Sequence, residues 1–209
     1  MASPLLTDLR ATWPLEAGSE LRDELVRAYA DPARGYHDTT HLSEVLARVA
    51  VLAEAGESFE RLPVVLAAWF HDSVYDVERD AEERSARWAE EALPELCDEA
   101  TVCEVVRLVR LTETHRPEDD DAEGCALSDA DLGILAAPPE RYASYVAAVR
   151  TEYAHLDDAT FAGGRAQVLA DLLDKPRLFH TDHAVRHWEA PARANASREL
   201  DELRALRVG

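Results

Sequence analysis

The chain has 209 residues, of which 47% are hydrophobic, and its 42 acidic and 22 basic side chains leave a formal charge of −20. This length and composition are enough for one domain with a substantial core. The negative charge argues against a nucleic-acid polymer or an anionic membrane as a partner, because both would be repelled. A small anionic ligand would need a local positive centre, such as a metal ion or an arginine cluster.

The cysteines and the apolar stretches indicate a cellular compartment. The three cysteines, Cys97, Cys103 and Cys125, form no CxxC pair, and the odd count disfavours both a disulfide framework and a zinc-thiolate site. Residues 1–12 lack the basic start and apolar run of a secretion signal, and the stretch from Leu62 to Phe70 is too short to cross a bilayer. We therefore expect a cytoplasmic protein.

Apolar residues recur at helical spacing along the chain, and no convincing run of alternating, β-branched residues appears. Clear examples are the stretches 42–52, 102–109 and 142–149. Turn-forming residues divide the helices at 31–35, 55–58, 116–121, 138–139 and Gly163-Gly164. The pattern predicts an all-α fold of roughly eight to ten helices in a single compact domain over residues 1–209.

One apolar helical stretch ends abruptly in two polar residues. Residues 67–76 read AAWFHDSVYD, so that His71 and Asp72 follow the apolar run directly. A buried His and Asp are costly unless they bond each other and the backbone or share a cation. Taken alone, a His-Asp pair favours the hydrogen-bonded structural reading. If the pair binds a metal, its mixed nitrogen and oxygen donors suit Mn²⁺, Fe²⁺, Co²⁺, Ni²⁺ or Zn²⁺, with Mg²⁺ as a further option.

Two other helical stretches offer matching ligands. Upstream, the sequence YHDTTH at 36–41 opens an amphipathic helix with His41, and downstream SDADL at 128–132 carries Asp129 and Asp131. Three helices can therefore converge on one ion. Two residues spaced i and i+2 point about 200° apart on a helix, so Asp129 and Asp131 should not both coordinate it.

An isolated His, then His-Asp, then a distant Ala-Asp on helical segments resembles the HD superfamily of metal-dependent phosphohydrolases. The motifs YHxxxH, AxWFHDxVYD, EExSA at 82–86, DADL and RTEY at 150–153 are similar to those of the bacterial group of predicted HD phosphohydrolases. The resemblance spans residues 20–200 and implies an HD-domain helical bundle with N- and C-terminal helical extensions packed on it.

The same resemblance implies the metal ligands. They would be His41, His71, Asp72 and one Asp of the DADL stretch. Asp131 is preferred because many HD enzymes have this ligand directly after a small residue, and Asp129 stays as the alternative ligand or as a partner of a ligand.

Residues 71–76 also resemble the HDxxED motif of guanosine tetraphosphate hydrolases, with Asp76 kept and Tyr75 in place of Glu. That departure gives guanosine tetraphosphate hydrolysis low weight. Asp76 or Glu82 is expected as the general base. A structural role is an equal alternative for each: Asp76 could be a helix cap or a surface carboxylate, and Glu82 could lie on a solvent-exposed helix face.

Substrate contacts are expected from three further residues. Arg34, just before the 36–41 segment, is the favoured phosphate ligand because two N–H groups of its guanidinium can pair with two phosphate oxygens. His37 and His115 are candidates for the substrate pocket. For each, a structural role with the ring hydrogen-bonded inside the fold is an equal alternative. His115 is also a candidate ligand of a second metal.

These features together predict a metal-dependent hydrolase that cleaves a phosphate ester of a small molecule, with a nucleotide as the favoured class because of the resemblance. The alternatives are a non-catalytic HD module that senses a nucleotide or metal and, with less support, a di-iron HD oxygenase. The expected partners are the small phosphorylated substrate and the ion, and a homodimer is left open.

Overall fold

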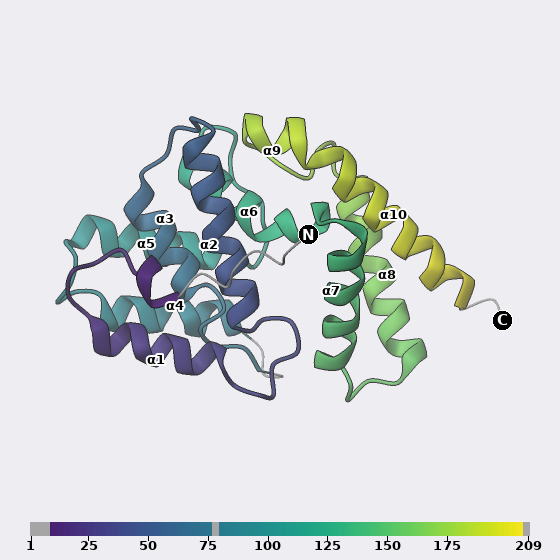
Figure 1. Ribbon diagram of the computed structural model, residues 1–209, viewed down its shortest axis with the longest axis horizontal. Helices are drawn as coiled ribbons and strands as arrows, with labels where there is room; N and C mark the ends of the chain where they lie inside the picture. The colour runs from purple at the N-terminus through teal and green to yellow at the C-terminus, as the bar shows by residue number, and fades with distance from the viewer. Residues whose placement is uncertain (1–8, 77–79, 207–209) are drawn as a thin grey trace.

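The computed structural model describes residues 9–76 and 80–206, which form ten α-helices, two short 3₁₀ helices and no strand (Figure 1). The all-α prediction is therefore confirmed. The elements in chain order are η1 Leu9–Thr12, α1 Ser19–Tyr29, α2 Thr39–Glu54, α3 Arg61–Phe70, α4 Ala81–Ala92, α5 Glu99–Leu111, α6 Ala122–Leu132, η2 Gly133–Ala136, α7 Pro139–Glu152, α8 Asp158–Asp174, α9 Asp182–His187 and α10 Glu189–Leu206.

Within the described ranges, no helix is both long enough and apolar enough to cross a membrane. The prediction that the N-terminal stretch holds no secretion signal rests mostly on residues 1–8, which lie outside the described residues.

Helix α3 lies at the centre of the α1 to α6 part of the molecule and contacts α2, α4, α5 and α6. It is apolar around nearly its whole circumference, and Trp69 and Phe70 are fully buried. A helix of this composition is stable in water only when neighbours cover all of its faces. The chain therefore emerges from α3 inside the molecule, where His71 and Asp72 follow.

Helix α2 begins with a side-chain cap that fixes the position of His41. The Asp38 carboxylate accepts hydrogen bonds from the backbone N–H groups of Thr40 at 2.7 Å and His41 at 3.1 Å. Such a cap satisfies donors that have no partner inside the helix. His41 is thus held in the first turn of α2, on the face that packs against α3 and α6.

Helices α7, α8 and α10 form the other side of the molecule in Figure 1. Helices α8 and α10 pack together around a small core of their own, built from Ala162, Ala166, Leu169, Ala196, Leu200 and Leu203. The predicted break at Gly163-Gly164 is wrong, because both glycines lie inside α8. The packing on α10 and the Asp157 cap of α8 outweigh a helix penalty of about 1 kcal/mol for each glycine.

Candidate metal centre

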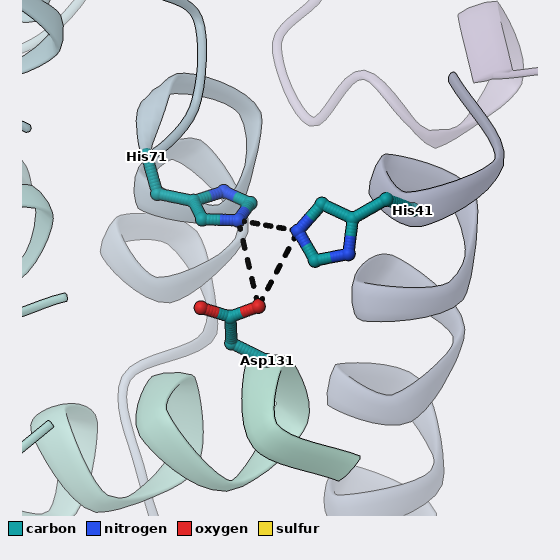
Figure 2. Close-up of side chains that lie close together, drawn as sticks. All are labelled: His41, His71 and Asp131. Atoms are coloured by element: carbon teal, nitrogen blue, oxygen red, sulfur yellow. Dashed lines mark hydrogen bonds and ion pairs between the residues drawn. The ribbon is translucent and has the colours of Figure 1, made fainter. Parts of the chain in front are cut away.

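Three helices bring His41, His71 and Asp131 together in the interior (Figure 2). The Nε2 atoms of His41 and His71 lie 3.0 Å apart, and the Oδ1 atom of Asp131 lies 3.3 Å from the first and 3.7 Å from the second. Both histidines are buried, with 1% of each side chain exposed. Figure 2 shows the three side chains pointing toward one common position.

A fourth donor comes from the residue after His71. The Oδ2 atom of Asp72 lies 3.2 Å from the Nε2 atoms of both His41 and His71. Ligand atoms that share one ion at 2.0–2.2 Å lie roughly 2.8–3.6 Å from one another in tetrahedral or octahedral geometry. The separations around the two histidines are close to this range. The group that could hold a metal ion is His41, His71 and Asp131, and Asp72 lies beside both histidines.

The outer nitrogens of both histidines have partners that orient the rings. The Nδ1–H of His71 donates to the carbonyl oxygen of Ala68 at 2.8 Å, which leaves a lone pair on Nε2 in the neutral ring. The Nδ1 atom of His41 lies 3.0 Å from the hydroxyl of Tyr36. Outer contacts of this kind are typical of metal-binding histidines because they fix the ring orientation.

Burial and the two carboxylates pull the pKa values of the group in opposite directions. Burial lowers the pKa of His41 and outweighs the carboxylates. Burial also acts to lower the pKa of His71, but Asp72 and Asp131 together raise it to about 9. The pKa values of both carboxyl groups are lowered, because the nearby histidines outweigh the cost of burial. The two carboxylates are thus ionised and lie against a protonated His71, and a divalent cation would take the place of that proton.

Asp129, the alternative ligand, is placed elsewhere. Its fully buried carboxylate accepts hydrogen bonds from the backbone N–H of His180 at 2.9 Å, and from the N–H and hydroxyl of Thr181 at 2.7 and 2.8 Å. Burial raises the pKa of this carboxyl group to about 6, although the hydrogen bonds from Thr181 and His180 act to lower it. The structure therefore brings Asp131 to the histidines, while Asp129 ties α6 to the start of α9.

Arg34 holds two loops together. Its Nη1 donates to the carbonyl oxygens of His37 at 2.8 Å and Asp72 at 2.7 Å, and its Nη2 donates to that of Ser73 at 3.0 Å. The guanidinium thus links the segment before α2 to the turn that carries the His-Asp pair. Its predicted contact with phosphate stays a prediction.

Replacing Arg34 with Ala should lower the free energy of unfolding by about 2 kcal/mol, because three carbonyl oxygens lose a charged donor. Urea unfolding followed by circular dichroism measures this, with the exposed Arg186→Ala as the control. If Arg34→Ala keeps its stability but loses affinity for phosphate, the result would instead support a phosphate-binding role for Arg34.

Glu152 at the end of α7 holds the segment that contains His37. Its Oε1 accepts hydrogen bonds from the backbone N–H groups of Gly35, Tyr36 and His37 at 3.1–3.2 Å, and its Oε2 lies 2.7 Å from Nδ1 of His37. Gly35 permits this approach, because a Cβ atom there would lie 2.4 Å from the carbonyl oxygen of Ala148. Burial lowers the pKa of His37, but the nearby Asp72 and Glu152 raise it more.

His115 lies on the other side of Asp131. Its Nε2 is 3.4 Å from the Oδ2 atom of Asp131, and its Nδ1 is 3.2 Å from the Ser128 hydroxyl. The φ of His115 is 48°, in the left-handed region that L residues rarely adopt. Burial lowers its pKa despite Asp131. The structure thus brings both His37 and His115 to the edge of the group.

The two candidate bases lie farther out. Asp76 forms a two-bond ion pair with Arg84, and 44% of its side chain is exposed. Glu82 lies in the first turn of α4, and among the described residues no hydrogen bond or ion pair joins it to the metal-binding group. Neither residue is brought to the histidines, and their role as general base stays a prediction.

Several residues near the site were not singled out from the sequence. Tyr36, Glu152 and Ser128 contact His41, His37 and His115, and Arg48 donates from Nη1 to the carbonyl oxygen of Ala130 at 3.2 Å, beside Asp131. Tyr36, Ser128 and Glu152 lie inside the quoted segments YHxxxH, SDADL and RTEY and could have been noticed there. Arg48 carries no local signal, because it is an ordinary basic residue in a chain rich in charged side chains.

No protein-family model matches the chain, and no curated protein or solved structure matches it either. The resemblance to HD phosphohydrolases therefore rests on the motifs alone. The geometry above supports a narrower statement, that His41, His71 and Asp131 form a buried group able to hold a metal ion.

Proposed function

We propose that the protein is a metal-dependent hydrolase that cleaves a phosphate ester of a small molecule. The observation that carries the proposal is the buried convergence of two histidines and two carboxylates, with His71 oriented by Ala68 so that its Nε2 faces Asp72 and Asp131. The motif resemblance adds the reaction class and favours a nucleotide as the substrate class. The HD family and the enzymatic activity are both parts of this proposal.

The charge of the chain supports a metal as the phosphate-binding centre. An anionic substrate approaches a protein with a formal charge of −20, so attraction must come from a local positive group. The nearby cations are largely engaged: Arg34 binds carbonyl oxygens, and Arg141 pairs with Glu44 at 2.6 Å. A divalent ion between Asp72 and Asp131 would supply the missing charge.

A divalent ion held here would polarise a phosphoryl oxygen and make a water molecule acidic enough to attack at neutral pH. The chain's own residues would position the reactants around it. Asp131 directs Oδ1 toward the histidines and Oδ2 toward His115, so its carboxylate can orient the attacking water and accept its hydrogen bond. His37 and His115 flank the centre, where their ring N–H groups can donate to phosphate oxygens.

The test combines metal content with a substrate screen. Protein purified without chelator should contain about one equivalent of a transition metal, measured by elemental analysis. Phosphate release should be found among nucleotides and sugar phosphates with added Mn²⁺, Co²⁺, Ni²⁺ or Mg²⁺, and EDTA should abolish it. Two irons without phosphate release would favour the oxygenase alternative, and absence of both metal and release would favour a binding module.

A further inference from the structure

A cavity of about 370 Å³ lies next to the segment that precedes α2 and leads to His41. Tyr36 and His37 before α2, Tyr145 of α7, Tyr153 after α7, and Phe161 and Arg165 of α8 are among the residues that line it. The volume lies at the small end of the roughly 300–1,000 Å³ typical of ligand sites. Four of the eleven lining residues are Tyr or Phe and three are Val or Leu, so the wall combines ring surfaces with aliphatic side chains.

Most polar groups of the wall already have partners. Arg165 donates from Nε and Nη2 to the buried carboxylate of Glu199 at 2.7 and 3.1 Å, and from Nη2 to the Tyr145 hydroxyl at 2.9 Å. The Thr160 hydroxyl donates to Asp157 at 3.1 Å. Because Glu199 neutralises Arg165, an anion gains little by entering the cavity. A flat and weakly polar group gains contact with the rings.

The cavity shares two residues with the surroundings of the metal centre. Tyr36 lines it and also contacts Nδ1 of His41 through its hydroxyl at 3.0 Å. His37 lines it too, and the centroid of its ring lies 5.3 Å from that of the His41 ring. A ligand in the cavity therefore lies against two residues that neighbour His41, one of the proposed metal ligands.

We propose that this cavity binds the organic part of the substrate and that this part is an aromatic ring system. The inference rests on the proposed function for the phosphate group of the substrate, and it adds the chemical class of the group to which the phosphate is attached. The ring is held by stacking and apolar contact, since the cavity wall offers few uncommitted polar groups to read the edge of a base. Aryl esters and nucleotides with different bases should therefore be accepted alike.

Two adjacent glycines of α8 provide a matched test. Gly164 lines the cavity and Gly163 does not, and a Cβ atom added at either position meets no atom within 4 Å. Both lie inside the same helix, so that Gly164→Leu and Gly163→Leu gain helix propensity equally. Only the Leu side chain at 164 would occupy the cavity.

The first readout is binding of 1-naphthol, a ring without phosphate, followed by fluorescence titration. We expect the wild type to bind it, Gly164→Leu to weaken binding at least about tenfold, and Gly163→Leu to stay within about twofold of the wild type. Phe161→Ala should also weaken it, because it removes one ring of the wall. No binding by the wild type, or equal binding by Gly164→Leu, would overturn the proposal.

The second readout separates this inference from the proposed function. With Mn²⁺ present, Gly164→Leu should raise the KM for 1-naphthyl phosphate and leave kcat/KM for glycerol 2-phosphate unchanged. If naphthol binding follows the expected pattern but no ester is hydrolysed with any metal, the aromatic site stands and the hydrolase fails. If Gly164→Leu hydrolyses 1-naphthyl phosphate as the wild type does, the aromatic site fails and the hydrolase stands.

Discussion

Replacing Asp131 with Asn should remove the bound metal while the protein stays folded. The Oδ1 atom of Asp131 lies 3.3 Å from Nε2 of His41, at the position where it would complete the ligand set. An amide oxygen is a much weaker ligand than a carboxylate for a transition metal, and loss of a contact that merely orients a ligand already costs 10–100-fold in affinity. We therefore expect metal affinity to fall at least about 100-fold.

Elemental analysis after gel filtration measures this loss, and circular dichroism verifies the fold. His71→Ala should lose the metal as well, whereas the exposed Asp201→Asn and His187→Ala should each keep about one equivalent. A folded Asp131→Asn variant that binds metal like the wild type would show that the buried group is only a hydrogen-bonded cluster. The phosphate-release activity should disappear together with the metal.

Replacing Asp129 with Ala should destabilise the fold by about 3 kcal/mol, because two backbone N–H groups and one hydroxyl would lose a buried acceptor. The carboxylate also positions Thr181, whose hydroxyl caps α9 by accepting from Ala184 N–H. In a chain of this length, such a loss corresponds to a fall in Tm of roughly 6–12 °C.

Differential scanning calorimetry checks this, with Asp201→Ala as an exposed control that should shift stability by no more than about 0.5 kcal/mol. The folded Asp129→Ala protein should still contain metal, since its carboxylate faces α9 rather than the histidines. The opposite outcome, normal stability with loss of metal, would make Asp129 the ligand in place of Asp131.

The helical class and the convergence of three helices were predictable from local patterns. An apolar run ending in His71-Asp72 requires a buried helix end, and the Asp-rich caps mark where helices start. The 200° separation of positions i and i+2 also predicted that only one of Asp129 and Asp131 would reach the histidines. The sequence alone could not say which of the two it would be, beyond the preference for Asp131.

Other features depend on contacts between residues far apart in the chain. Glu152 binds the His37 segment across more than a hundred positions, Arg34 binds the turn after α3, and Asp129 binds the start of α9. Gly163 and Gly164 look like a break, yet packing on α10 keeps them helical. Periodicity and capping are short-range effects that sequence encodes directly. The partner of a charged side chain is decided only when helices pack. The aromatic cavity and the outer contacts of the histidines therefore depend on the tertiary structure.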